Sequence, residues 1–163
     1  MKSFVILLLV VFSFLWMHNF ITADSINAVE IKEKFLKIVG GEKAKEVITK
    51  YDKVEIFRLA DESEKKVISE GIKLNSEKSK ILSKLLTDYK TYVWEDGNNC
   101  LPDWGVMFVF YKGNDKVEVM LCLDCDIIKF INGGEEEINP IRVELLAIIK
   151  PMFPNDKKIQ DLK

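Results

Sequence analysis

Two β-rich runs joined by a tight turn are the feature that most constrains the fold of this 163-residue chain. The first run follows Cys100 and reaches Tyr111, and the second extends over residues 116–131. Between them, residues 112–115 read Lys-Gly-Asn-Asp, which is the composition of a short hairpin turn. The pattern predicts a β-hairpin that folds back near residues 113–114.

Helical patterns flank this hairpin on both sides. Apolar residues recur at helical spacing over residues 24–51, with a break at Gly40-Gly41, and again after Ser76 and from Ile141 to Ile149. Further strands are expected at residues 53–60, 67–75 and 91–94, whereas residues 135–137, all glutamate, are expected to be a solvated segment. The combination predicts an α+β domain, with an antiparallel sheet of four to five strands and helices packed on one face.

The N-terminus has the pattern of a secretory signal peptide. Lys2 precedes an almost uninterrupted apolar run from Phe4 to Met17, and Ala23 offers a small residue for cleavage. The run is shorter than the ~20 apolar residues of a membrane-spanning helix. We therefore expect residues 1–23 to be a signal peptide and residues 24–163 to be a single secreted or periplasmic domain. Contact with a membrane is expected only through an uncleaved N-terminal segment.

Charge and histidine content narrow the possible functions. The 24 basic and 26 acidic residues are interspersed, so no basic stripe indicates binding to nucleic acid. The only histidine, His18, lies in the segment that is expected to be removed. Histidine is the commonest general base and the commonest zinc nitrogen ligand, so its loss excludes serine–histidine and cysteine–histidine hydrolases. The sequence shows no complete catalytic constellation, and a non-enzymatic role is favoured.

The three cysteines, Cys100, Cys122 and Cys125, all lie in or beside the predicted hairpin. In an exported protein, cysteines are expected to oxidise. Folding the chain back at either Gly113-Asn114 or Asn114-Asp115 places Cys125 opposite residues 102–104, close to Cys100. A bridge outside the Cys-x-x-Cys motif would therefore join Cys100 to Cys125, and Cys122 would be a small buried apolar residue on the sheet.

Two other uses of the cysteines stay open. A redox role for Cys122 and Cys125 requires a reactive thiolate, which the negative charges of Asp124 and Asp126 disfavour. A zinc site requires four ligands, so an aspartate such as Asp103, Asp124 or Asp126 would have to join the three cysteines.

The cysteine spacing resembles that of small exported bacterial proteins of unknown function. In that family a Cys-x-x-Pro-x-x-Gly strand precedes a Val-x-Leu-x-x-Cys-x-x-Cys strand. Here Cys100-x-Pro102-x-x-Gly105 precedes a second run that begins at Val117 and ends in the Cys-x-x-Cys motif. This chain has one residue fewer between the cysteine and the proline. The resemblance implies that the three cysteines act together, and it implies no activity.

Aromatic and acidic residues gather at the open end of the predicted hairpin. Trp94 and Trp104 could stack on sugar rings or pack against a peptide, with Asp103 and Asp124 beside them. Paired carboxylates could also cleave a glycosidic bond, but no cleft-forming insertion is visible. The sequence therefore predicts a binding or interaction module without a cofactor, for an unidentified protein, peptide or carbohydrate. The alternative is a thiol-redox or metal-handling protein, with zinc as the metal.

Overall fold

The computed structural model describes residues 29–62, 65–94, 100–122, 124–138 and 141–163. The chain divides into two units, Met1–Lys34 and Phe35–Lys163, and a helix over residues 29–39 crosses the boundary. The elements that follow this helix are α2 (Gly41–Thr49), β1 (Lys53–Glu62), β2 (Ile72–Lys73), α3 (Ser76–Thr87), the 3-10 turn η1 (Tyr89–Thr91), β3 (Trp104–Lys112), β4 (Asp115–Cys122), β5 (Ile127–Phe130), β6 (Glu135–Glu137), α4 (Arg142–Ile149), the 3-10 turn η2 (Lys150–Met152) and α5 (Lys157–Asp161). The expected cleavage after Ala23 lies outside the described residues, so the predicted domain boundary stays a prediction.

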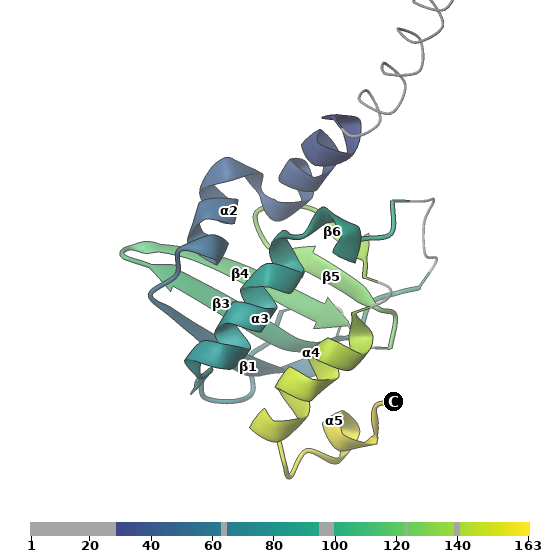
Figure 1. The fold of residues 1–163 in the computed structure, drawn as a ribbon. Helices are drawn as coiled ribbons and strands as arrows, with labels where there is room; N and C mark the ends of the chain where they lie inside the picture. The colour runs from purple at the N-terminus through teal and green to yellow at the C-terminus, as the bar shows by residue number, and fades with distance from the viewer. Residues whose placement is uncertain (1–28, 63–64, 95–99, 123, 139–140) are drawn as a thin grey trace, which may run out of the picture. The chain divides into compact units, whose positions relative to one another are not determined.

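The strands form one antiparallel sheet in the order β2-β1-β3-β4-β5-β6, with α3 and α4 in front of it in Figure 1. The predicted α+β class is therefore confirmed, but the described part of the chain has six strands rather than four to five. One strand that was not expected is β6, the glutamate segment, which pairs with β5 at the edge of the sheet. Strand pairing uses backbone groups, so charged side chains at an edge do not prevent it.

The main core lies between the helices and one face of the sheet. Val106, Phe108 and Phe110 alternate along β3 toward this face and are at most 1 % exposed. The helices contribute apolar residues to the same core, among them Val47 and Ile48 of α2, Leu82 and Leu86 of α3, and Leu145 and Ile149 of α4. Because all of these side chains share one cluster, the helices cover one face of the sheet, as predicted.

The opposite face of the sheet carries a second, smaller apolar cluster, which includes Met107, Met120 and Cys122. Long lysine side chains lie across this face. Lys65 reaches the carboxylate of Glu118 on β4 at 2.5 Å, and the ammonium of Lys129 lies 5.8 Å from the centre of the Trp104 ring. The apolar stems of such lysines can cover buried side chains while the charges stay in water.

β3 and β4 form the predicted hairpin. Lys112 pairs with Asp115 across a turn in which Gly113 has φ of 55°, and the pairing continues to Val106 and Leu121 in the expected register. The second β-rich run is not a single strand, however. β4 ends at Cys122, residues 124–126 form a turn, and β5 begins at Ile127.

Two other predicted strands are wrong in extent or type. Residues 67–75 contribute only the short β2 and a single bridge between Val67 and Leu59. Residues 91–94 do not form a strand, because the preceding chain closes the 3-10 turn η1. Asp88 caps that turn by accepting a hydrogen bond from the amide of Lys90 at 3.0 Å. An aspartate side chain that accepts a hydrogen bond from a backbone amide two residues later favours a turn over a strand.

Candidate functional site

The predicted disulfide between Cys100 and Cys125 is present. Their Cα atoms lie 5.9 Å apart, within the usual range for a bridged pair, and 25 positions separate them along the chain. The bridge ties the segment before β3 to the turn between β4 and β5. Residue pairing alone led to the right partner, although Cys125 sits in a turn and not on the continuous strand that the sequence predicted.

Cys122 is the free cysteine of the described chain, and its side chain is fully buried. It ends β4 and belongs to the apolar cluster on the face opposite the helices, together with Cys125. A strict strand would have placed the two residues on opposite faces. The turn after Cys122 returns Cys125 to the same cluster. Cys122 therefore occupies a buried apolar position on the sheet, as the sequence predicted.

Among the described residues, no group of three or more histidine, cysteine, aspartate or glutamate side chains is arranged to hold a metal ion. The zinc alternative stays a prediction, as does the expectation that the chain has no cofactor.

The structure does not bring the two tryptophans together. Trp94 is half-buried beside the helix-side core, where its indole N–H donates to the carbonyl of Tyr89 at 2.9 Å. Trp104 is 3 % exposed and belongs to the cluster on the other face of the sheet. A flat ligand could not stack on both rings from one side. The predicted binding surface therefore divides into two separate regions.

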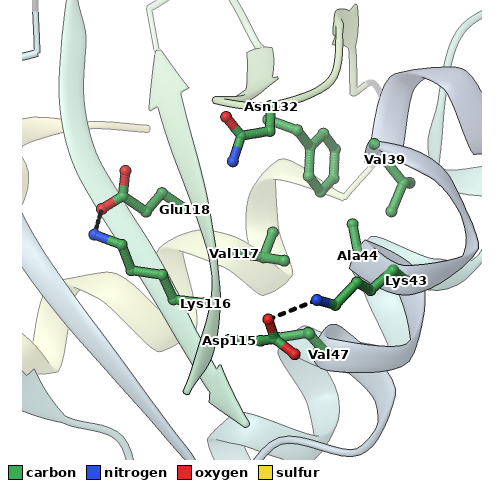
Figure 2. A pocket seen from close by; sticks show the side chains of 11 residues that line it. Val39, Lys43, Ala44, Val47, Asp115, Lys116, Val117, Glu118 and Asn132 are labelled. Carbon is green, nitrogen blue, oxygen red and sulfur yellow. Dashed lines mark hydrogen bonds and ion pairs between the residues drawn. The ribbon is translucent and has the colours of Figure 1, made fainter. Parts of the chain in front are cut away.

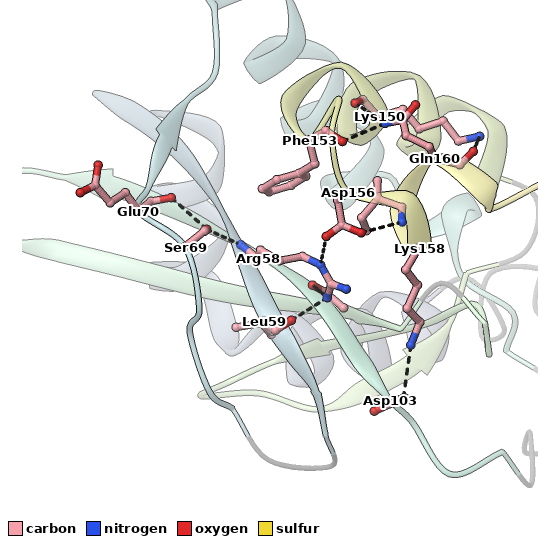
Figure 3. Close-up of polar contacts among 12 residues, drawn as sticks. Arg58, Leu59, Ser69, Glu70, Asp103, Lys150, Phe153, Asp156, Lys158 and Gln160 are labelled. Atoms are coloured by element: carbon pink, nitrogen blue, oxygen red, sulfur yellow. Dashed lines mark hydrogen bonds and ion pairs between the residues drawn. The ribbon is translucent and has the colours of Figure 1, made fainter.

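The two aspartates of that predicted surface do lie near each other. Asp103 and Asp124 line a small hollow of about 10 Å³, which Lys158 and Arg58 also border. The ammonium of Lys158 lies 3.5 Å from the carboxylate of Asp103 (Figure 3). The hollow is at the lower limit of the space that one water molecule needs, so the two aspartates do not face a ligand-sized cleft.

Arg58 borders the same hollow, and sequence reasoning missed its role. Its guanidinium donates from Nε to the carboxylate of Asp156 at 2.7 Å, and from Nη1 to the carbonyls of Leu59 at 2.5 Å and Gly105 at 2.8 Å (Figure 3). The alternation of side chains along β1 was the feature of the sequence that could have indicated the burial of Arg58. Val54 and Ile56 face the core, so a strand predicts that Arg58 also faces inward and needs buried partners.

A larger hollow lies elsewhere, between α2 and the start of β4. Its volume is about 240 Å³, and it is lined by apolar residues together with the polar and charged residues Lys43, Asp115, Lys116, Glu118 and Asn132 (Figure 2). The break in the helical pattern at Gly40-Gly41 lies between the helix over residues 29–39 and α2. These glycines have φ of 94° and 90° and form the corner at which α2 begins, and Gly40 borders the hollow. Two adjacent glycines inside a helical pattern were the available signal for this corner.

Comparison with known proteins identifies no relative. No protein-family model matches the chain, and no curated protein or solved structure matches it significantly. In the described part of the chain, no helix has the length and apolar character needed to cross a membrane.

Proposed function

We propose that this chain is an exported, non-enzymatic binding module whose cysteines serve its structure. The observation that carries the proposal is the disulfide between Cys100 and Cys125. Disulfides persist mainly in oxidising compartments outside the cytosol. The signal-peptide pattern of residues 1–23 and the resemblance to small exported bacterial proteins support the same location, either secreted or periplasmic.

The burial of Cys122 supports a structural role over a redox role. A thiol that exchanges disulfides with a substrate must be reached by that substrate, and reactive cysteines are partly exposed. Cys122 has no exposed surface, and Cys125 is 6 % exposed within the same apolar cluster. The ligand of the module is a protein, a peptide or a small polar molecule such as a carbohydrate.

Thiol counting on the secreted chain tests this proposal. The full-length chain would be expressed in a bacterium with a secretory pathway, and its intact mass measured after alkylation. We expect a chain that lacks residues 1–23, with one alkylated cysteine in denaturant and all three alkylated after reduction. In the Cys122→Ala variant the unreduced chain should show no alkylation, because the remaining pair stays bonded.

Three results would contradict the proposal. Full alkylation without reductant would show that the disulfide does not form. A bond mapped between Cys122 and Cys125 would favour the redox alternative. Alkylation that becomes complete only after a chelator is added would favour metal handling by the three cysteines.

A further inference from the structure

The hollow beside α2 combines an apolar floor with a charged rim. Val47 of α2, Val117 of β4 and Phe130 of β5 supply the floor and are each at most 9 % exposed. At the rim, the ammonium of Lys43 lies 2.7 Å from the carboxylate of Asp115 (Figure 2). A floor that excludes water beside a few polar groups is the usual arrangement of a small-molecule site.

The shape of this hollow depends on the backbone corner at Gly40-Gly41. Both residues adopt positive φ, which residues with a side chain rarely do. A Cβ atom at Gly40 would also lie 3.2 Å from the carbonyl oxygen of Asn132, which lines the hollow. The corner therefore holds the start of α2 close to the turn that follows β5.

The other charges at the hollow are already matched to each other. Glu118 accepts hydrogen bonds from Lys116 at 2.8 Å and from Lys65 at 2.5 Å. Burial alone would raise the pKa of Glu118, but these two lysines outweigh burial and hold the pKa below its usual value. Glu118 is therefore charged at neutral pH and neutralised by its own partners. Lys43 and Asp115 are also paired with each other, but the side chain of Asp115 is 49 % exposed whereas that of Glu118 is 13 % exposed, so a ligand can reach the Lys43–Asp115 pair.

We propose that this hollow binds a zwitterionic small molecule with an apolar side chain, which is the chemistry of a free α-amino acid such as phenylalanine or leucine. The proposal rests on the role of the chain as a binding module and names its ligand class. The ligand carboxylate pairs with Lys43, the ligand ammonium pairs with Asp115, and the apolar side chain covers Val117 and Phe130.

Charge complementarity selects a zwitterion over a fatty acid or an amine. Lys43 and Asp115 are close together and opposite in sign, so a ligand with one charge meets a like charge at the rim. Each group also has hydrogen-bonding capacity beyond their mutual contact, since an ammonium has three donors and a carboxylate has several acceptor positions. The side chains of the pair are 75 % and 49 % exposed, so their own attraction is weak and opens readily for a ligand.

The volume of the hollow also favours a ligand of this size. The hollow measures about 240 Å³, which is below the roughly 300–1,000 Å³ of drug-sized pockets. An amino acid fits this space, whereas a folded peptide segment or an oligosaccharide would extend out of it.

Isothermal titration calorimetry on the purified protein tests the proposal. The ligands are L-phenylalanine and L-leucine, with 3-phenylpropionate, phenethylamine and glycine as analogues that lack the ammonium, the carboxylate and the side chain. We expect saturable binding of the two apolar amino acids, and binding of each analogue that is at least about fivefold weaker.

Variants of the rim test which residues make the contacts. Lys43→Met and Asp115→Asn should each weaken phenylalanine binding about fivefold, because each removes one exposed charge contact. Lys80→Met and Glu77→Gln on α3 are matched controls, since neither residue lines the hollow, and they should leave the affinity unchanged. The thermal unfolding of all four variants shows whether each has kept its fold.

The proposal is overturned if neither amino acid binds, if 3-phenylpropionate or phenethylamine binds as tightly as phenylalanine, or if folded Lys43 and Asp115 variants bind normally. These outcomes are independent of the thiol count. A secreted chain with one free thiol that binds no amino acid would refute this ligand class and leave the proposed function standing. A chain with three free thiols would refute the disulfide-braced module whatever it binds.

Discussion

Arg58 lies in the interior with 6 % of its surface exposed, and its guanidinium donates hydrogen bonds to several acceptors there. It pairs with the carboxylate of Asp156, which follows it by 98 positions, and donates to the carbonyls of Leu59 and Gly105. Asp156 in turn accepts a hydrogen bond from the amide of Ile159 at 3.1 Å and so caps α5. One side chain thus fastens the C-terminal helix to β1 and β3.

We expect Arg58→Met to lower the free energy of unfolding by about 3 kcal/mol, because it leaves a partly buried carboxylate and two carbonyls without their donor. Urea unfolding followed by circular dichroism measures the change. Lys50→Met, which removes an exposed pair with Glu46, should have little effect on the same curve. Equal stability of the Arg58 variant and the wild type would show that water replaces the guanidinium at no cost.

Tyr111 has a raised pKa for an identifiable reason. Burial, together with a hydrogen bond to Glu55 and the negative charge of that carboxylate, raises the pKa of Tyr111 to about 12. Because the pKa in the folded state lies above the ordinary value of about 10, this residue contributes stability that is complete below pH ~10 and is lost as the pH rises toward 12.

The absorbance of tyrosinate during an alkaline titration should therefore show a step near pH 12 that is missing in Tyr111→Phe. In Glu55→Gln the step should move down toward the ordinary tyrosine pKa, since the negative charge is lost and a neutral amide oxygen accepts a weaker hydrogen bond than a carboxylate does. Glu77→Gln on α3 serves as the control. If the Tyr111→Phe curve matches the wild-type curve between pH 10 and 12, the assignment is wrong.

The sequence predicted strands and turns best where the apolar periodicity and the turn residues indicated the same structure. The β3–β4 hairpin has both, and its register is one of those that a turn at Gly113-Asn114 or Asn114-Asp115 predicts. The turn between β4 and β5 contains no glycine or proline. Asp126 adopts φ of 53° there, a conformation that aspartate tolerates better than most residues, so the two aspartates of this segment were the available turn signal.

The candidate site was less predictable than the fold, because it depends on which elements meet. The pairing of Cys100 with Cys125 follows from strand register, which is a local property. The separation of Trp94 from Trp104 does not follow from strand register. Trp94 comes after the 3-10 turn η1, in a segment whose composition predicted a strand. The hollow at Lys43 and Asp115 forms only when α2 docks on β4, so no sequence window contains it.

The turn between β5 and β6 docks closely on the end of the helix over residues 29–39. The amide of Gly134 donates to the carbonyl of Ile38 at 2.9 Å, and a Cβ atom at Gly133 would lie 2.0 Å from the same oxygen. We therefore expect Gly133→Ala to lower the free energy of unfolding by about 2 kcal/mol or more, because backbone atoms must move apart. Gly105→Ala is the matched control, since its Cβ would meet its nearest atom at 3.8 Å. Equal urea midpoints for the two variants would contradict the close contact.

The disulfide should be the largest single support of the β3–β4–β5 ribbon. Closing a loop between residues 25 positions apart stabilises a folded chain by about 3 kcal/mol in the chain-entropy model. We expect Cys100→Ser with Cys125→Ser to lower the free energy of unfolding by about that amount. Cys122→Ala, which keeps the bridge, should cost less than about 1.5 kcal/mol. A larger loss in Cys122→Ala than in the double variant would mean that packing around Cys122, and not the bridge, holds the ribbon.

The strand order divides the sheet into interior strands and two edge strands. β1, β3, β4 and β5 have neighbours on both sides, whereas β2 and β6 end the sheet. β6 consists of three glutamates and pairs with β5 through only three residues. Interior strands of a cooperative sheet exchange their amide hydrogens through global unfolding, and edges exchange through local opening.

Native-state hydrogen exchange with and without reductant should therefore give different results for the two classes of strand. Reducing the disulfide lowers the global free energy of unfolding, so the amides of β3 should exchange about 100-fold faster, which corresponds to about 3 kcal/mol. The amides of β6 already exchange through opening of the edge, and their rates should change much less. The Cys100→Ser, Cys125→Ser double variant provides the control, because reductant should alter neither class in it. Equal acceleration of β3 and β6 in the wild type would instead show that the sheet opens as one unit from edge to edge, with no independent edge at the glutamate strand.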